Sequence, residues 1–262
     1  MSSLLTNVSA MTALQTLRGI NNSLSTTQNR IATGERVSEA RDNPAYWSIA
    51  VGMKAQNSVL STVQDSLGLG KAILDTTYTA MADAIEHATV IVSKYVAMET
   101  DGVDQNAIGA EIDQRIEQIV QIALAAQFEG QNLLSSAGAA VNIVSGYIKG
   151  GGGVQMLELQ PYDLEDAVTD ITDVATAETF LDEIKTAAAE YGAMKMRIDS
   201  QVAFTSQQMD AIDRGIGQLV DADMEAESAR LSALQVQQQL AIQALSIANS
   251  SPQNILTLFR GG

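Results

Sequence analysis

Charge is almost absent from both ends of this chain. Residues 1–29 hold one charged side chain, Arg18, and residues 231–259 hold none, although the formal net charge of the 262-residue chain is −16. In both ends apolar residues recur at steps of 3, 4 and 7, which is the spacing of helices in coiled coils. A long uncharged helix needs another surface to cover it, so the sequence predicts terminal helices that are buried in a multi-stranded assembly.

Three apolar stripes define these terminal arms. Leu14, Leu17, Leu24 and Ile31 form the front stripe, Leu234, Ala241, Leu245 and Ala248 form the rear stripe, and Val236, Leu240 and Ile247 lie on an adjacent face of the rear helix. With two stripes, the rear helix could meet more than one neighbour. The periodicity alone leaves open the alternative of an amphipathic tail that packs on its own domain.

Composition favours a mainly α protein with a sizeable core. Hydrophobic residues make up 46% of the chain, aromatic residues only 4%, and there are three prolines. The absence of cysteine excludes disulfides and thiolate chemistry. The acidic balance argues against nucleic acid or an anionic membrane surface as a partner. We expect no membrane insertion and no secretory signal peptide, so export would need another route.

The predicted fold is a set of long antiparallel helical rods with a terminal coiled coil and a small β-hairpin region. A first rod is expected from about 47 to 98, a turn at Glu99–Asp104, a second helix after it, and a final rod from about 176 to 220. The predicted divisions are residues 1–34 with 222–262 for the coiled coil, 35–46 with 214–221 for joint segments, 47–134 with 166–213 for the rods, and 135–165 for the hairpin.

Charged residues and glycines gather at the two joints. Arg36, Arg41 and Asp42 are predicted to belong to a network of ion pairs at the first joint. Asp221 and Asp223, preceded by Gly215 and Gly217, mark the second joint and an acidic helix start.

The sequence offers no catalytic constellation, so we expect neither an enzyme nor a cofactor or metal site. His87 is the one histidine, which excludes a two-histidine zinc motif, and no serine lies in a GxSxG elbow. Four glycines at 150–153 lack the Lys-Ser/Thr of a phosphate loop and predict a hairpin tip instead.

Three segments carry a family resemblance. NRIATGERVSEARDNPAYWSIAVGMKAQ (29–56) resembles the N-terminal signature of bacterial flagellins, FEGQNLL (128–134) is similar to the family's step out of its second helix, and residues 220–260 resemble the C-terminal signature almost end to end. Residues 135–175 match nothing diagnostic, as expected for the family's variable outer region.

The resemblance implies a subunit of the flagellar filament, secreted to the cell exterior. In such a subunit the terminal arms line an inner tube and fold on assembly, and the rods form an outer tube. The implied partners are further copies of the chain, other flagellins in the same filament, an export chaperone of the flagellar type III apparatus, the cap protein and the hook–filament junction proteins. A junction protein and a generic helical bundle are the alternatives.

One departure concerns innate recognition. Family members that the Toll-like flagellin receptor senses carry QRVRELAV on the long helix, where this chain has TVIVSKYV (89–96). Val90 and Val92 replace the two arginines, which predicts that this chain escapes the receptor.

Overall fold

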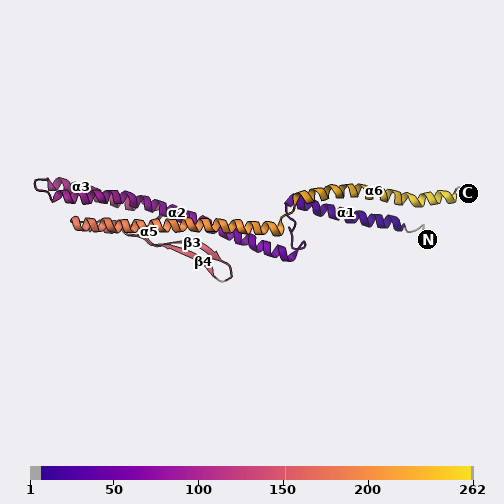
Figure 1. Cartoon of the computed structure of the whole chain (residues 1–262), viewed down its shortest axis with the longest axis horizontal. Helices are drawn as coiled ribbons and strands as arrows, with labels where there is room; N and C mark the ends of the chain where they lie inside the picture. The colour runs from indigo at the N-terminus through magenta and orange to yellow at the C-terminus, as the bar shows by residue number, and fades with distance from the viewer. Residues whose placement is uncertain (1–6, 151, 261–262) are drawn as a thin grey trace. The chain divides into compact units, whose positions relative to one another are not determined.

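The computed structural model describes residues 7–150 and 152–260, the last ten of these by their backbone only. The chain divides into two compact units, one formed by Met1–Lys54 with Asp213–Gly262 and the other by Ala55–Ile212. The helices in chain order are α1 (Val8–Thr33), α2 (Pro44–Met98), α3 (Gln105–Ala125), α4 (Leu164–Ala167), α5 (Val174–Val220) and α6 (Met224–Arg260). The predicted mainly α fold with long rods is confirmed (Figure 1).

The unit of residues 55–212 is built on three long helices. The turn before α3 is closed by Asp104, whose carboxylate accepts hydrogen bonds from the amides of Asn106 and Ala107, so α3 folds back along α2. Lys94 then meets Glu111 at 2.7 Å. Lys71 pairs with Asp199 and Lys195 with Asp75, both at 2.5 Å, which sets α5 antiparallel to α2.

One hydrophobic core lies between these three helices and the segments that join α3 to α5. Its largest fully buried side chains are Leu67, Leu74, Met81, Ile91, Ile119, Leu133, Leu134, Leu159, Leu164, Ile184 and Ile198. Burial of this apolar surface is the dominant stabilising term for the unit. Tyr78 of α2 lies outside this core: its side chain is exposed, and the centre of its ring lies 5.9 Å from the Lys195 ammonium.

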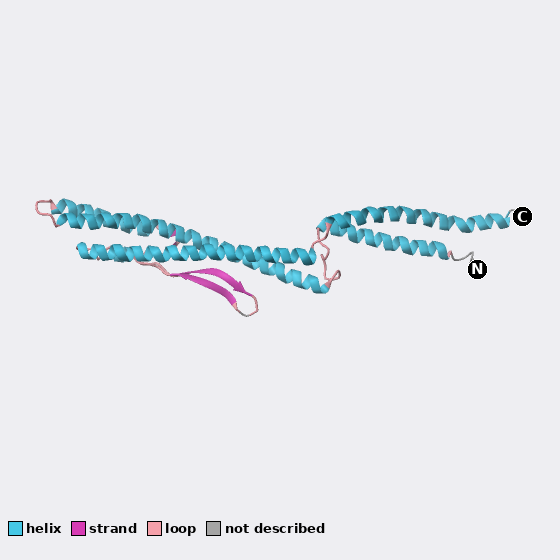
Figure 2. Ribbon diagram, in the orientation of Figure 1, coloured by secondary structure: helices cyan, strands magenta, loops and turns pink. Residues whose placement is uncertain are grey.

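The predicted β-hairpin is confirmed. Strands β3 (Val141–Ile148) and β4 (Gly153–Leu159) pair antiparallel, with Val141 opposite Leu159 and an irregularity between Val144 and Gly146 (Figure 2). Ile143, Leu157 and Leu159 face the core. Gly70 lets β3 approach α2, since a Cβ atom there would lie only 2.1 Å from Ile143 Cδ1.

Two small elements were not predicted. Strands β1 (Gln127–Phe128) and β2 (Gln131–Asn132) form a second short hairpin, whose turn holds Glu129 and Gly130 at positive φ. The single-turn helix α4 follows Asp163, which caps it. Both are too short to leave a periodic pattern in the sequence.

Candidate functional site

The terminal helices α1 and α6 pack against each other in their own unit, antiparallel and side by side (Figure 1). Local chemistry sets where each begins and ends. Asn7 caps α1 by accepting a hydrogen bond from the Ala10 amide, and Gly34 ends it in the left-handed region at φ 71°. Asp223 caps α6 by accepting from the amides of Glu225 and Ala226, at 3.0 and 3.1 Å.

Three polar ties fix the alignment of the two helices. Arg30 Nη1 lies 3.0 Å from Glu227 Oε1, Gln238 Nε2 donates to Asn21 Oδ1 at 2.7 Å, and Asn7 Nδ2 donates to the Ala248 carbonyl at 2.7 Å. From the first tie to the third, the residue number increases along α6, from 227 to 248, and decreases along the N-terminal segment, from 30 to 7. All three ties therefore share one antiparallel register.

The predicted arm residues divide into two groups. Leu17, Leu24, Ile31, Leu234 and Leu245 are buried or half-buried, as are Ala241 and Ala248, whereas Leu14 is exposed. The adjacent stripe is open: Val236, Leu240 and Ile247 are 56%, 58% and 70% exposed. One face of α6 thus has a partner in its own chain and another has none among the described residues.

Glu227 is the site residue that the sequence reasoning did not single out. Its side chain is only 11% exposed, and that of its partner Arg30 is 27% exposed. Glu227 precedes Leu234, Ala241 and Ala248 at steps of seven. Heptad spacing therefore predicts that it lies on the same face of α6 as these three residues, the face that packs on α1 and that we call the seam. Its Oε2 atom has no hydrogen-bond partner within the described residues.

The joint is held mainly by backbone hydrogen bonds. Glu35 and Asp221 form an isolated antiparallel bridge, the Arg36 amide donates to the Val220 carbonyl at 2.6 Å, and the Ala222 amide donates to the Gly34 carbonyl at 2.9 Å. Charge contributes less, through two ion pairs between solvent-accessible side chains: Arg41 with Glu39 at 2.8 Å and Lys54 with Glu35 at 2.7 Å.

The other predicted joint residues depart from the expected ion-pair network. Arg36 donates through Nη2 to the Leu219 carbonyl at 3.0 Å. Asp42 accepts hydrogen bonds from the amides of Ser38 and Glu39, and chiefly these backbone bonds, the one to Glu39 first, lower its pKa. Gly215 and Gly217 do not mark a break, because α5 runs through both to Val220.

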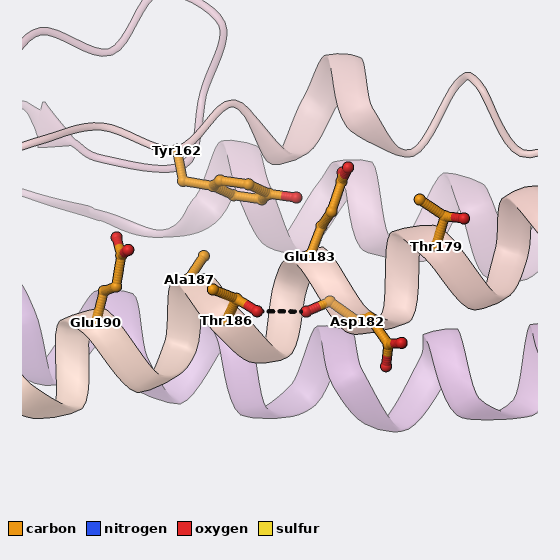
Figure 3. Close-up of a pocket in the computed structure, with 7 residues that line it drawn as sticks. All are labelled: Tyr162, Thr179, Asp182, Glu183, Thr186, Ala187 and Glu190. Atoms are coloured by element: carbon orange, nitrogen blue, oxygen red, sulfur yellow. Dashed lines mark hydrogen bonds between the residues drawn. The ribbon is translucent and has the colours of Figure 1, made fainter.

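A groove of about 510 Å³ on the other unit is the competing candidate. Tyr162 lies over α5, with its hydroxyl beside Glu183, and Asp182 and Glu190 line the same helix (Figure 3). Burial, with help from the charges of Glu183 and Asp163, raises the pKa of Tyr162 to about 12. The lining offers carboxylates but no nucleophile with an adjacent base.

Among the residues that the structure describes, no group of three or more His, Cys, Asp or Glu side chains is placed to hold a metal ion. In the same part of the chain, no helix combines the length and apolar character needed to cross a membrane.

The receptor-motif positions, Val90 and Val92, lie on α2 within the unit of residues 55–212, which we call the rod unit. Val90 is half-buried and accepts a hydrogen bond from Ser93 Oγ through its carbonyl at 2.7 Å. Val92 is half-buried against the core. Neither position presents a positive charge.

Comparisons with known proteins agree on both terminal regions. Residues 4–139 match the model of the bacterial flagellin N-terminal helical region, and residues 174–259 match that of the C-terminal helical region. The chain is 46% identical to a flagellin of Brucella melitensis, with all of both chains covered, and 38% identical to flagellin C of Rhizobium meliloti, with 99% of this chain and 100% of that one covered. It also resembles a crystal structure of Bacillus cereus flagellin at 18% identity, over 66% of this chain and 94% of that one, with a TM-score of 0.29.

Proposed function

Because the chain belongs to the bacterial flagellin family, and is therefore a structural subunit of the filament that bacteria rotate to swim, we propose that α1 and α6 are the parts through which it polymerises. The contact residues would be Leu14 on α1, with Leu240, Ile247 and Val236 on α6. Leu17, Leu24, Ile31, Leu234 and Leu245 would hold the two arms together within each subunit.

The exposed stripe of α6 is the observation that carries this proposal. Val236, Leu240 and Ile247 leave more than half of their surface in water, on a helix with no charge between residues 231 and 259. A helix face of this kind is stable only when something apolar covers it. In a protein that self-assembles, a second copy supplies that cover.

The same argument assigns places in the filament. Residues 1–34 and 222–262 would form the inner tube, 35–46 and 214–221 the connecting segments, 47–134 and 166–213 the outer tube, and 135–165 the outward hairpin. Each buried arm would gain most of its stability from neighbouring subunits, so the arms would fold fully only on assembly.

Assembly outside the cell follows from family membership. We also propose how the subunit reaches the filament. It would be secreted in an unfolded state through the flagellar type III apparatus, with the help of an export chaperone. It would then be added beneath a cap protein, in a filament that stands on the hook–filament junction proteins. Co-assembly with other flagellins is part of the same proposal. No catalytic role is assigned, since flagellins are structural proteins.

Electron microscopy of seeded or salted-out protein tests the role of the arms. The full chain should form filaments, and a chain that lacks residues 231–262 should stay monomeric with its rod helices intact by circular dichroism. Filaments from both chains would overturn the assignment to α6. If both stayed monomeric while the full chain were rigid throughout, a junction protein would be the better interpretation.

A further inference from the structure

The turn between α2 and α3 holds the one place in this sequence where aspartate or asparagine precedes glycine, at Asp101 and Gly102. Residues 99–104, which form the turn, are all exposed. Gly102 has φ 92°, in the left-handed region that glycine adopts without strain. Within the described residues, neither the Gly102 amide nor the Asp101 carboxylate has a hydrogen-bond partner. The amide nitrogen is therefore available to react with the side chain that precedes it.

Such a pair of residues can rearrange without an enzyme. The Gly102 nitrogen attacks Cγ of the Asp101 side chain in its carboxylic-acid form, so that an N–Cγ bond forms, the Cγ–OH bond breaks, and the hydroxyl leaves as water with the amide hydrogen. Water then opens the resulting succinimide ring. Attack at Cγ restores aspartate, whereas attack at the backbone carbonyl gives isoaspartate, whose main chain runs through Cγ. One water leaves and one returns, so no further reactant is needed.

The helices protect the other susceptible pairs of this chain. Glycine is the least hindered residue to follow the reacting side chain, and serine comes next because its side chain is small. The pairs in which aspartate or asparagine precedes serine all lie inside helices: Asn22 with Ser23 in α1, Asn57 with Ser58 and Asp65 with Ser66 in α2, Asp199 with Ser200 in α5, and Asn249 with Ser250 in α6. An amide inside a helix donates to the carbonyl four residues earlier, so it must leave that bond before it can react.

We propose that Asp101 is a site of spontaneous isoaspartate formation in the folded protein, and hence a site of methylation by enzymes that act on the free α-carboxylate of isoaspartate. The inference does not depend on the proposed polymerisation, because the turn lies within the rod unit of a single chain. The product keeps its negative charge and adds one atom to the main chain of the turn. Since no residue of 99–104 belongs to the hydrophobic core, the modified subunit should keep its fold.

Ageing of the purified full-length protein at neutral pH measures the reaction. Isoaspartate can be located by electron-transfer mass spectrometry of peptides, and counted by incubation with an isoaspartyl methyltransferase and radiolabelled S-adenosylmethionine. We expect at least about tenfold more isoaspartate at Asp101 than at Asp199, whose neighbouring amide must first leave a helical hydrogen bond. Asp101→Glu should abolish the product at this position and most of the methyl label, because the ring would need six members and closes far more slowly. Equal amounts at Asp101 and Asp199 would overturn the inference.

Denaturation separates the effect of the fold from that of the sequence. In guanidinium chloride the amount of isoaspartate at Asp199 should rise by at least about fivefold, whereas the amount at Asp101 should change by less than about twofold, because only the first site is protected in the folded state. Isoaspartate that appeared at Asp101 only in the denaturant would show that the folded turn blocks the reaction, and would overturn the inference. Asp101→Asn loses ammonia in place of water and closes the ring faster, so the folded variant should form more isoaspartate at this position. No increase would also contradict the inference.

Discussion

Arg30 Nη1 lies 3.0 Å from Glu227 Oε1 and joins the last turn of α1 to the first turn of α6. The helix dipoles also favour both charges, because the cation Arg30 lies at the C-terminus of α1 and the anion Glu227 at the N-terminus of α6. The pair sits beside the joint, where the Ala222 amide bonds to the Gly34 carbonyl. It therefore anchors the register of the terminal arms at the end nearest the rods.

Removing one member of this pair should loosen the arms. Glu227→Ala leaves the half-buried Arg30 without its partner, and we expect a loss of about 2 kcal/mol in the stability of the helix pair, read from the thermal melting of filaments. Glu225→Ala, at an exposed glutamate in the same helical turn, should change stability by less than about 0.5 kcal/mol.

A second comparison separates charge from shape at this site. Arg30→Met combined with Glu227→Leu removes both charges and keeps apolar volume, so it should recover most of the lost stability. If Glu227→Ala melted at the same temperature as the unaltered filament, the pair would have no anchoring role.

Two glycines in α2 should respond in opposite directions to alanine. A Cβ atom at Gly70 would lie 2.1 Å from Ile143 Cδ1 in the core, whereas one at Gly68 would meet nothing within 4 Å. We expect Gly70→Ala to destabilise the rod unit by about 1 to 3 kcal/mol through overpacking, and Gly68→Ala to stabilise it by about 0.5 to 1 kcal/mol through helix propensity. Urea unfolding of monomers measures both. Equal effects of the two changes would show that β3 does not approach α2 at Gly70.

Tyr162, which is half-buried, and Tyr191, which is buried, are two phenols that differ in hydrogen bonding. Tyr191 donates a hydrogen bond to the Gln160 carbonyl at 2.9 Å, whereas the Tyr162 hydroxyl has no partner within the described residues. Tyr191→Phe should therefore cost about 1 kcal/mol at neutral pH, and Tyr162→Phe should be neutral or slightly stabilising. Denaturant unfolding at pH 7 distinguishes the two.

The same two residues predict an alkaline loss of stability. Burial raises both pKa values from 10.0 to about 12, so in this range the folded state keeps protons that the unfolded state releases. Stability should be complete below pH 10 and fall as the pH rises toward 12. Each Phe variant should lessen that fall, measured by denaturant unfolding at pH 8 and 11. An undiminished fall in both variants would assign it to other groups.

How far the sequence predicts this structure depends on whether a feature repeats. The helices and the terminal seam follow from steps of three, four and seven, and the hairpin from its β-prone runs around four glycines. Glu227 shares the seven-residue step of the seam, but an acidic residue near a helix start has an equally good local explanation. The Arg36 bond to the Leu219 carbonyl depends on backbone placement far along the chain, which no local pattern encodes.

Innate recognition provides a test outside the filament. The resemblance predicts that Val90 and Val92, both half-buried, stand where sensed flagellins carry arginine. We therefore expect purified monomer to activate cells that report the Toll-like flagellin receptor at least about tenfold less than a sensed flagellin at equal concentration. Since a charge-assisted contact is lost at each position, the deficit should appear in the half-maximal dose. Full activation at the same dose would refute the proposed escape.

Charge placed on the terminal helix should separate polymerisation from folding. Leu240 is 58% exposed and Leu245 is half-buried, and we expect Asp at either position to block filament formation. A carboxylate at 240 would be buried between subunits and one at 245 between α1 and α6 of the same subunit, and it has no partner in either place. The monomer should keep the rod unit folded, since neither residue belongs to residues 55–212. Sedimentation after seeding measures assembly, and circular dichroism measures the fold. Leu240→Asn, which is polar but uncharged, should weaken assembly less than Leu240→Asp does. Normal filaments from either Asp variant would mean that this part of α6 stays in contact with water, and the polymerising surface would have to be sought elsewhere.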